Sequence, residues 1–277
     1  MEIGWLESLL YGLLSGFTEF VPVSAQAHGA VLRRLFGCGE IHFIDLAVHL
    51  ASLISLLVCV YPQFSRLNRE RKLATLPRSH RNRQPDIVAL MDLRLLKTAA
   101  VPMLLMFLIS PVTSKLGSDL IWMALFFVLN GLILYFPRLR PTGNKDSTML
   151  TPADALLLGL SSGLGILPGI SRIGAFQSVA SLRGADRQHS VNLALLFSVA
   201  ALGALCVIDL LWLILVNFAG ITLILVLKGL LAALAAYIGT WLGIALVRFL
   251  AVKAGYSFFA YYSWGAALFV FILFLMI

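Results

Sequence analysis

One pattern of glycine, serine and proline occurs twice in this sequence, once in each half. The first copy is Gly-Leu-Leu-Ser-Gly at residues 12–16, followed by Pro22 and Ser24. The second is Gly-Leu-Ser-Ser-Gly at residues 159–163, followed by Pro168 and Ser171. Both copies interrupt long apolar segments, and paired breaks of this kind are typical of a binding site between two repeats of a membrane protein. A membrane tolerates such breaks only where protein or water receives the freed backbone groups. The repeat therefore predicts where the functional site lies.

The chain is too apolar for a soluble domain of its length. Of its 277 residues, 60% are hydrophobic and 12% are charged, and several apolar runs reach the roughly 20 residues that a helix needs to cross a bilayer. Cys38, Cys59 and Cys206 are scattered and have no metal-ligand spacing, so we expect small packing residues. The N-terminal residues lack the basic charge of a cleaved signal peptide. These features predict an all-α integral membrane protein.

The basic residues indicate an orientation rather than a nucleic-acid partner. The net charge is +8, and nine of the 21 lysines and arginines lie between Arg66 and Lys97. This polar stretch joins two apolar spans, so the positive-inside rule places it in the cytoplasm. The basic segment from Arg138 to Lys145 falls on the same side, and the poorly charged loops near Gly117 and at residues 217–220 should face outward. No nucleic acid is expected to bind.

The apolar runs predict six transmembrane helices and two re-entrant helix pairs with inverted topology. The expected spans are residues 42–61, 94–113, 119–137, 190–217, 221–250 and 257–277. The re-entrant pairs are 3–36 and 153–183, with breaks at 21–24 and 168–171 where proline ends one helix and serine can cap the next.

These elements form a single membrane domain over residues 1–277, with one repeat over about 1–137 and the other over about 153–277. The basic cytoplasmic loop covers about 62–93. Counted from this loop, the first re-entrant pair enters from outside and the second from inside. The two breaks should then meet near the middle of the membrane.

Reactive and charged side chains lie at both breaks. Glu19 places a carboxylate in an apolar segment, which predicts a functional acid because such a charge is costly; a structural acid bonded to nearby backbone is the alternative. Ser24 and His28 are four residues apart, so on a helix the imidazole can reach the hydroxyl as a nucleophile–base pair, although a capping serine beside a packed histidine would look identical. Ser171 and Arg172 begin a half-helix and predict an anion site; a snorkelling or salt-bridged arginine is the alternative.

Residues 15–28, SGFTEFVPVSAQAH, resemble the first signature of the undecaprenyl-diphosphate phosphatase family of the BacA type. Residues 168–175, PGISRIGA, resemble its second signature, and further likeness follows in the same order at 45–50, 131–134 and 259–262. The resemblance implies interdigitated inverted repeats with re-entrant helices, in a multi-pass protein of the bacterial cytoplasmic membrane whose site opens to the outer side. It implies removal of the terminal phosphate from the C55 polyprenyl diphosphate released by peptidoglycan synthesis, an activity linked to bacitracin resistance.

The resemblance also implies roles for particular residues. Glu19 would bind Mg²⁺ or Ca²⁺ or act in acid–base chemistry, and Ser24 or His28 would belong to the nucleophilic group. The expected substrate-binding residues are Gly169, Ser171, Arg172 and Gly174. Gln26 and His49 are further candidates, with His49 either lining the cavity or bonding a backbone carbonyl. The implied partners are a polyprenyl diphosphate lipid and the membrane, and the sequence leaves a homodimer open.

The chain departs from the family signatures within the site itself. Ser15 stands where the first signature usually has a glutamate, and residues 25–27 read Ala-Gln-Ala where it usually has Ser-Ser/Thr-Gly. Ile173 stands where the second signature usually has a serine, and Ser263 where an arginine usually follows the late tyrosine. The loss of one of two carboxylates should weaken Mg²⁺ or Ca²⁺ binding.

Two functions follow from these departures. One is a working polyprenyl-diphosphate phosphatase that relies on Glu19, Ser24, His28 and Arg172. The other is a non-hydrolytic binder or flippase for the same lipid, in which the inverted repeats provide alternating access.

Overall fold

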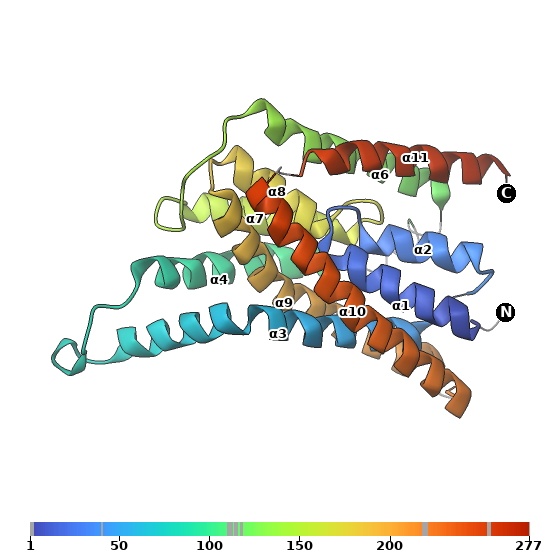
Figure 1. Cartoon of the computed structure of the whole chain (residues 1–277), viewed down its shortest axis with the longest axis horizontal. Helices are drawn as coiled ribbons and strands as arrows, with labels where there is room; N and C mark the ends of the chain where they lie inside the picture. The colour runs from blue at the N-terminus through green and yellow to red at the C-terminus, as the bar shows by residue number, and fades with distance from the viewer. Residues whose placement is uncertain are drawn as a thin grey trace.

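The computed structural model of this protein consists of helices and their connections over the residues it describes, which are 3–39, 41–109, 113, 116, 119–217, 221–253 and 256–276. Figure 1 shows a long helical hairpin at one end of the molecule and both chain ends at the other. The predicted outward-facing connections near Gly117 and at 218–220 lie outside the described residues.

The helices follow one another in a simple order. They are α1 (Trp5–Phe20), α2 (Ala25–Leu35), α3 (His42–Thr75), α4 (Ile87–Phe107), α6 (Leu120–Tyr135), α7 (Pro152–Gly163), α8 (Arg172–Leu182), α9 (Arg187–Trp212), α10 (Leu223–Lys253) and α11 (Phe258–Met276). Within the described residues, five helical segments are long and apolar enough to cross a membrane: His42–Thr75, Leu120–Leu139, Arg187–Leu215, Leu223–Ala251 and Phe258–Met276. These segments confirm a multi-pass, all-helical membrane protein.

The expected sixth span, residues 94–113, corresponds to α4 and the residues after it. Helix α4 has 21 residues, which is long enough to cross a bilayer. Its first half carries Asp92, Arg94 and Lys97, and it is not among the five apolar segments. The described residues therefore show five apolar spans and one helix of sufficient length but greater polarity.

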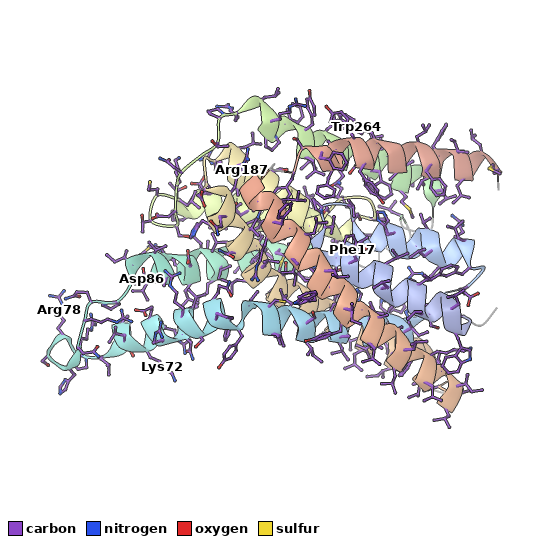
Figure 2. All side chains as sticks on the ribbon, viewed as in Figure 1. Phe17, Lys72, Arg78, Asp86, Arg187 and Trp264 are labelled. Atoms are coloured by element: carbon purple, nitrogen blue, oxygen red, sulfur yellow. The ribbon has the colours of Figure 1, made fainter. Side chains whose placement is uncertain are left out.

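Helix α3 is longer than the sequence predicts. It continues from the expected end at residue 61 through Pro62 to Thr75, so the first part of the predicted polar loop 62–93 is helical. The added turns are rich in arginine, glutamate, lysine and leucine, which are strong helix formers. Buried Glu70 accepts hydrogen bonds of 2.9 and 2.5 Å from both terminal nitrogens of Arg83, which fixes the returning chain against the helix. Figure 2 shows Lys72, Arg78 and Asp86 at this end of the molecule.

The chain returns into the body of the molecule at the start of α4. The Asp86 carboxylate accepts from the backbone N–H of Val88 at 3.0 Å and caps the helix. Its other oxygen accepts from the Arg66 guanidinium at 2.5 Å. This hydrogen bond from Arg66 is the main reason that the pKa of Asp86 lies below its ordinary value.

The glycines of the repeated pattern permit close contacts between helices. A Cβ atom added to Gly16 of α1 would lie 2.3 Å from the carbonyl oxygen of Ala236 in α10. A Cβ atom added to Gly159 of α7 would lie 2.1 Å from the carbonyl oxygen of Ala99 in α4. Small residues allow helix backbones to approach this closely in membrane proteins. Each broken helix pair therefore packs against a helix from the other half of the chain.

The two breaks contact each other, as the sequence predicts. Asn130, completely buried in α6, lies between them: its amide donates to the carbonyl oxygen of Pro22 at 3.2 Å, and its side-chain oxygen accepts from the N–H of Ser171 at 2.8 Å. The N–H of Gly169 donates directly to Ser24 Oγ at 2.9 Å. These bonds satisfy backbone groups that the breaks free from helical pairing.

Candidate active site

Glu19 and Arg172 form a buried ion pair that joins the two breaks. Glu19 lies in the last turn of α1, and Arg172 is the first residue of α8. Arg172 Nη2 donates to Glu19 Oε1, and the two side chains are only 8% and 7% exposed, respectively. Each charge offsets the cost of burying the other. The salt-bridged alternative for Arg172 is therefore present, and the carboxylate predicted to be functional is its partner.

Two buried polar atoms close to this ion pair have no hydrogen-bond partner in the described part of the chain. They are Arg172 Nε and Ser15 Oγ. Ser15 is one helical turn before Glu19, so the two side chains lie on the same face of α1. Buried polar atoms are usually hydrogen-bonded, so two unpaired donors near Glu19 indicate a place for a polar ligand.

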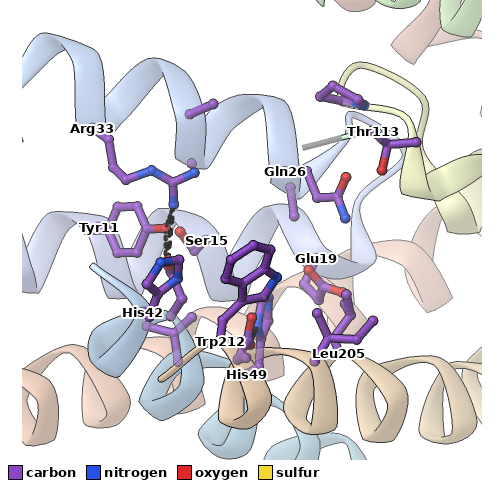
Figure 3. A pocket seen from close by; sticks show the side chains of 18 of the residues that line it. Tyr11, Ser15, Glu19, Gln26, Arg33, His42, His49, Thr113, Leu205 and Trp212 are labelled. Carbon is purple, nitrogen blue, oxygen red and sulfur yellow. Dashed lines mark hydrogen bonds and ion pairs between the residues drawn. The ribbon is translucent and has the colours of Figure 1, made fainter. Parts of the chain in front are cut away.

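A cavity of about 440 Å³ lies against this region. Ser15 and Glu19 line it, and so do the predicted residues Gln26 and His49 (Figure 3). Its volume is in the range of small-molecule sites. The other predicted site residues do not belong to the lining: Ser24, His28, Gly169, Ser171, Arg172 and Gly174. Of the nine predicted site residues, three therefore line the cavity and six do not.

Ser24 and His28 do not form the expected imidazole–hydroxyl contact. The Ser24 hydroxyl is turned to the second break, where it accepts from Gly169, and it does not cap α2. His28 Nδ1 lies 2.7 Å from the Ser24 carbonyl oxygen, which can only accept, so Nδ1 carries the proton. Nε2 then accepts from the Tyr262 hydroxyl at 2.7 Å. The ring centroids of His28 and Phe127 are 5.6 Å apart, so His28 is packed between helices.

Ser24 has an unusual backbone conformation for a residue with a side chain. Its φ of +69° lies in the left-handed region, where it is the only non-glycine residue among those described. Such a conformation costs energy and persists only where its surroundings hold it. The bond between Ser24 and Gly169, whose own φ is +124°, supplies this support.

The residues near Arg172 that were predicted to bind phosphate form hydrogen bonds and packing contacts within the protein. Ser171 Oγ accepts from the N–H of Gly174 at 3.1 Å and caps α8. A Cβ atom on Gly174 would lie 2.9 Å from Leu134 Cδ2 and 3.0 Å from Pro22 Cβ, so glycine allows α8 to pack closely against the first break. Gly169, Ser171 and Gly174 therefore shape the second break and position Arg172, and their N–H groups or hydroxyl already have partners.

Three further polar residues in the cavity wall were not predicted as site residues. Tyr11 donates to the Asp45 carboxylate, and Arg33 Nη1 lies 2.6 Å from the Tyr11 hydroxyl oxygen and 3.2 Å from Asp45 Oδ1. This network joins α1, α2 and α3 in the cavity wall. Arg33 and Asp45 are charges at the ends of apolar segments, and that signal could have suggested that they pair.

His49 has a side-chain partner rather than the backbone carbonyl considered above. Its Nδ1 lies 2.5 Å from Asp209 Oδ2, and both residues line the cavity. Asp209 is a charged residue within an apolar stretch of α9, and this position marks it as notable in the sequence. The sequence does not indicate that His49 is its partner.

The donors around Glu19 do not fit a tightly held divalent cation. Among the described residues, no group of three histidine, cysteine, aspartate or glutamate side chains is arranged to hold a metal. Glu19 is paired with Arg172, and Ser15 offers only a hydroxyl. Mg²⁺ and Ca²⁺ prefer several oxygen ligands, with carboxylates prominent among them.

Comparison with known proteins extends over nearly the whole chain. The sequence model of the family described as bacitracin resistance protein BacA matches residues 8–269. The chain is 30% identical over 263 residues to the undecaprenyl-diphosphatase of Carboxydothermus hydrogenoformans, covering 93% of both chains. It is 27% identical over 276 residues to the undecaprenyl-diphosphatase of Methanobrevibacter smithii, covering 96% of both. The protein of the same name from Thermodesulfovibrio yellowstonii is 25% identical over 281 residues, with 97% of this chain and 96% of the relative covered.

Proposed function

Because this chain belongs to the bacitracin resistance protein BacA family, we propose that it hydrolyses undecaprenyl diphosphate to the monophosphate and inorganic phosphate. The relatives named undecaprenyl-diphosphatase match 93–97% of its length. The substrate is a polyprenyl diphosphate lipid, and the protein that acts on it is embedded in the membrane. The reaction regenerates the lipid carrier of cell-wall synthesis.

The observation that carries this function is the pair of unpartnered buried donors beside Glu19. Arg172 Nε and Ser15 Oγ are suited to the oxygens of a phosphate group, and the guanidinium is an effective phosphate ligand. Apolar side chains that include Met123, Leu205 and Ile208 share the cavity wall, so a prenyl chain can lie beside the polar group that is being hydrolysed. Fixed cationic and hydrogen-bond donors stabilise the charge that develops as a phosphoryl group is transferred.

The architecture that we propose has six transmembrane helices and two re-entrant pairs, α1–α2 and α7–α8. Helix α4 is the sixth crossing, and residues 1–137 and 153–277 are two halves of inverted topology. Three features support this arrangement: the breaks contact each other, α1 packs against α10, and α7 packs against α4. The charged first half of α4 then lies at the cytoplasmic boundary.

The orientation follows from the charge distribution. The basic residues around Arg78 lie at the end of the molecule opposite the chain termini (Figures 1 and 2), and we place that end in the cytoplasm. Cavity residues Arg33 and Cys38 come from the end of α2 and the connection to α3, toward the other end. The cavity of this cytoplasmic-membrane protein therefore opens to the outer side.

Hydrolysis by the purified protein tests this function. Phosphate release from C55 diphosphate is measured for the native protein, for Arg172→Ala and for Arg138→Ala, in which an exposed arginine outside the cavity is removed. We expect Arg172→Ala to lose about 100-fold or more in kcat, as when a single transition-state donor is removed. Arg138→Ala should match the native protein. Lipid binding without phosphate release would instead favour the non-hydrolytic binder or flippase.

We also propose that Glu19 binds Mg²⁺ or Ca²⁺ only weakly, because Arg172 already pairs with its carboxylate. The native protein should therefore retain most of its activity in EDTA. In Ser15→Glu, a second carboxylate stands one turn from Glu19 and supplies the charge that a divalent cation prefers. The activity of this variant should rise with added Mg²⁺ or Ca²⁺, measured against the native protein in the same titration. An abrupt loss of native activity in EDTA would contradict the proposal.

A further inference from the structure

The cavity contains a second acid–base pair on the wall away from the two breaks. His49 lies on α3 and Asp209 on α9, and the two side chains are 21% and 15% exposed, respectively. Figure 3 shows His49 on the side of the cavity opposite Gln26, beneath Trp212. His49 Nδ1 is 2.5 Å from Asp209 Oδ2. The pair thus belongs to helices that contribute nothing to the breaks themselves.

The bond to Asp209 determines which nitrogen of His49 can meet a ligand. A carboxylate accepts hydrogen bonds, so Nδ1 carries a proton and the ring orientation is fixed. In the described part of the chain, Nε2 makes no hydrogen bond, whereas both ring nitrogens of His28 are engaged. Among the histidines near the predicted site, His49 therefore has a nitrogen available on the cavity side.

Three carboxylates line the cavity around His49. Asp209 of α9 contacts it, and the carboxylates of Glu19 in α1 and Asp45 in α3 line the same cavity. Arg172 pairs with Glu19, and Arg33 of α2 pairs with Asp45. Asp209 is left to His49, which makes the pair electrically balanced when the imidazole carries a charge. The cavity lining also contains the titratable groups of Tyr11, Arg34, Cys38 and His42.

We propose that His49 Nε2–H contacts the bridging oxygen of the diphosphate and donates its proton to that oxygen, with Asp209 as the positioning residue. This inference rests on the proposed phosphatase function. An oxygen nucleophile forms a bond to the terminal phosphorus, and the bond from that phosphorus to the bridging oxygen breaks. The bridging oxygen leaves with the electron pair and takes the Nε2 proton. When water supplies the nucleophile, the proton it releases restores the imidazolium, so no further reactant is consumed.

The proposal gives the cavity residues two different roles. Ser15 and Glu19 line the cavity, with Arg172 paired to Glu19, and serve the terminal phosphate, whereas His49 serves the departing lipid phosphate. General acids of this kind contribute roughly 10²–10⁴-fold to a rate. We therefore expect His49→Gln to lower kcat by about 100-fold or more while KM changes by less than about 5-fold, because glutamine can still donate a hydrogen bond but cannot transfer a proton.

The experiment compares pH–rate profiles for the native protein, His49→Gln, Asp209→Asn and His80→Gln, whose histidine is exposed and outside the cavity. The native rate should fall on the alkaline side as the donor loses its proton. His49→Gln should abolish this limb, Asp209→Asn should move it to lower pH, and His80→Gln should leave it in place. Binding of C55 diphosphate by each purified variant is measured in parallel and reports whether the cavity is intact.

The outcomes separate this inference from the function on which it rests. If the native protein releases phosphate and His49→Gln is equally active, or keeps the alkaline limb unchanged, the role of His49 is refuted. The phosphatase function would then still be supported. A native protein that releases no phosphate overturns both hydrolysis and proton transfer.

Discussion

The ion pair between Glu19 and Arg172 should be strongly coupled in stability as well as in function. Three variants test this: Glu19→Gln, Arg172→Met and the double variant. Glutamine and methionine approximate the size of the native side chains without their charge. Both native side chains are more than nine-tenths buried, so water cannot replace the lost partner in either single variant.

The expected magnitudes follow from what each substitution leaves behind. Glu19→Gln leaves a buried guanidinium whose Nε already lacks a partner, and breaking a buried ion pair costs about 3–5 kcal/mol. Arg172→Met leaves a buried carboxylate that can take up a proton, which places its cost near the lower end of that range. The double variant leaves no buried charge. We expect it to be destabilised by about 3 kcal/mol less than the sum of the two single variants.

The assay is equilibrium unfolding in mixed detergent micelles, followed by circular dichroism, for the native protein and the three variants. The coupling free energy is the difference between the double variant and the sum of the singles. Additive effects, within about 0.5 kcal/mol, would refute the reasoning. Such a result would mean that the two side chains do not depend on each other in the folded protein.

Two further predictions concern packing and pH. Gly16→Ala should destabilise the protein by about 1–3 kcal/mol because its Cβ would meet the backbone of Ala236. A Cβ on Gly265 meets nothing within 4 Å, so Gly265→Ala should be neutral or stabilising by up to about 1 kcal/mol. Equal unfolding midpoints for the two variants would contradict this prediction. The lowered pKa of Asp86 implies stability that is fully present above the ordinary aspartate pKa of about 3.9 and lost as pH falls through the folded-state value. The native protein should therefore be more stable than Asp86→Asn at pH 7, and the difference should shrink as the pH falls below about 3.9. An unfolding series from pH 7 to pH 2 that shows a constant difference would exclude the contribution of the hydrogen bond from Arg66.

The architecture could be predicted from the sequence where a local signal fixed it. Proline and serine at 21–24 and 168–171 mark both breaks, and the structure ends α1 at Phe20 and begins α8 at Arg172. The ends of α3 were predicted less well, because hydropathy detects where a membrane span ends and not where a helix ends. Residues 62–75 are polar but have high helix propensity, so the helix continues beyond the apolar segment.

The sequence shows which polar residues lie at the first break but not the directions in which their side chains point. Glu19, Ser24 and His28 occupy neighbouring turns around the first break, and a helical spacing rule places Ser24 and His28 on one face. The rule fails because Ser24 precedes α2 and has a positive φ, which turns its hydroxyl to Gly169. The pairing of His49 with Asp209 joins residues 160 positions apart. No local pattern specifies such a contact, which depends on how α3 packs against α9.

The charge balance of the cavity connects the departure at Ser15 with the expected weak metal binding. The buried region where the two breaks meet contains one carboxylate, Glu19, and one guanidinium, Arg172, and their charges neutralise each other before any substrate enters. A second carboxylate at position 15 would leave this buried region with an excess negative charge, which repels a diphosphate unless a divalent cation enters as well. With serine there, the region is neutral and keeps two unpaired donors for the phosphate oxygens. The substitution at Ser15 should thus shift catalysis from a metal ion to the protein's own donors, and this shift is why a proton donor such as His49 becomes important for the departing lipid phosphate.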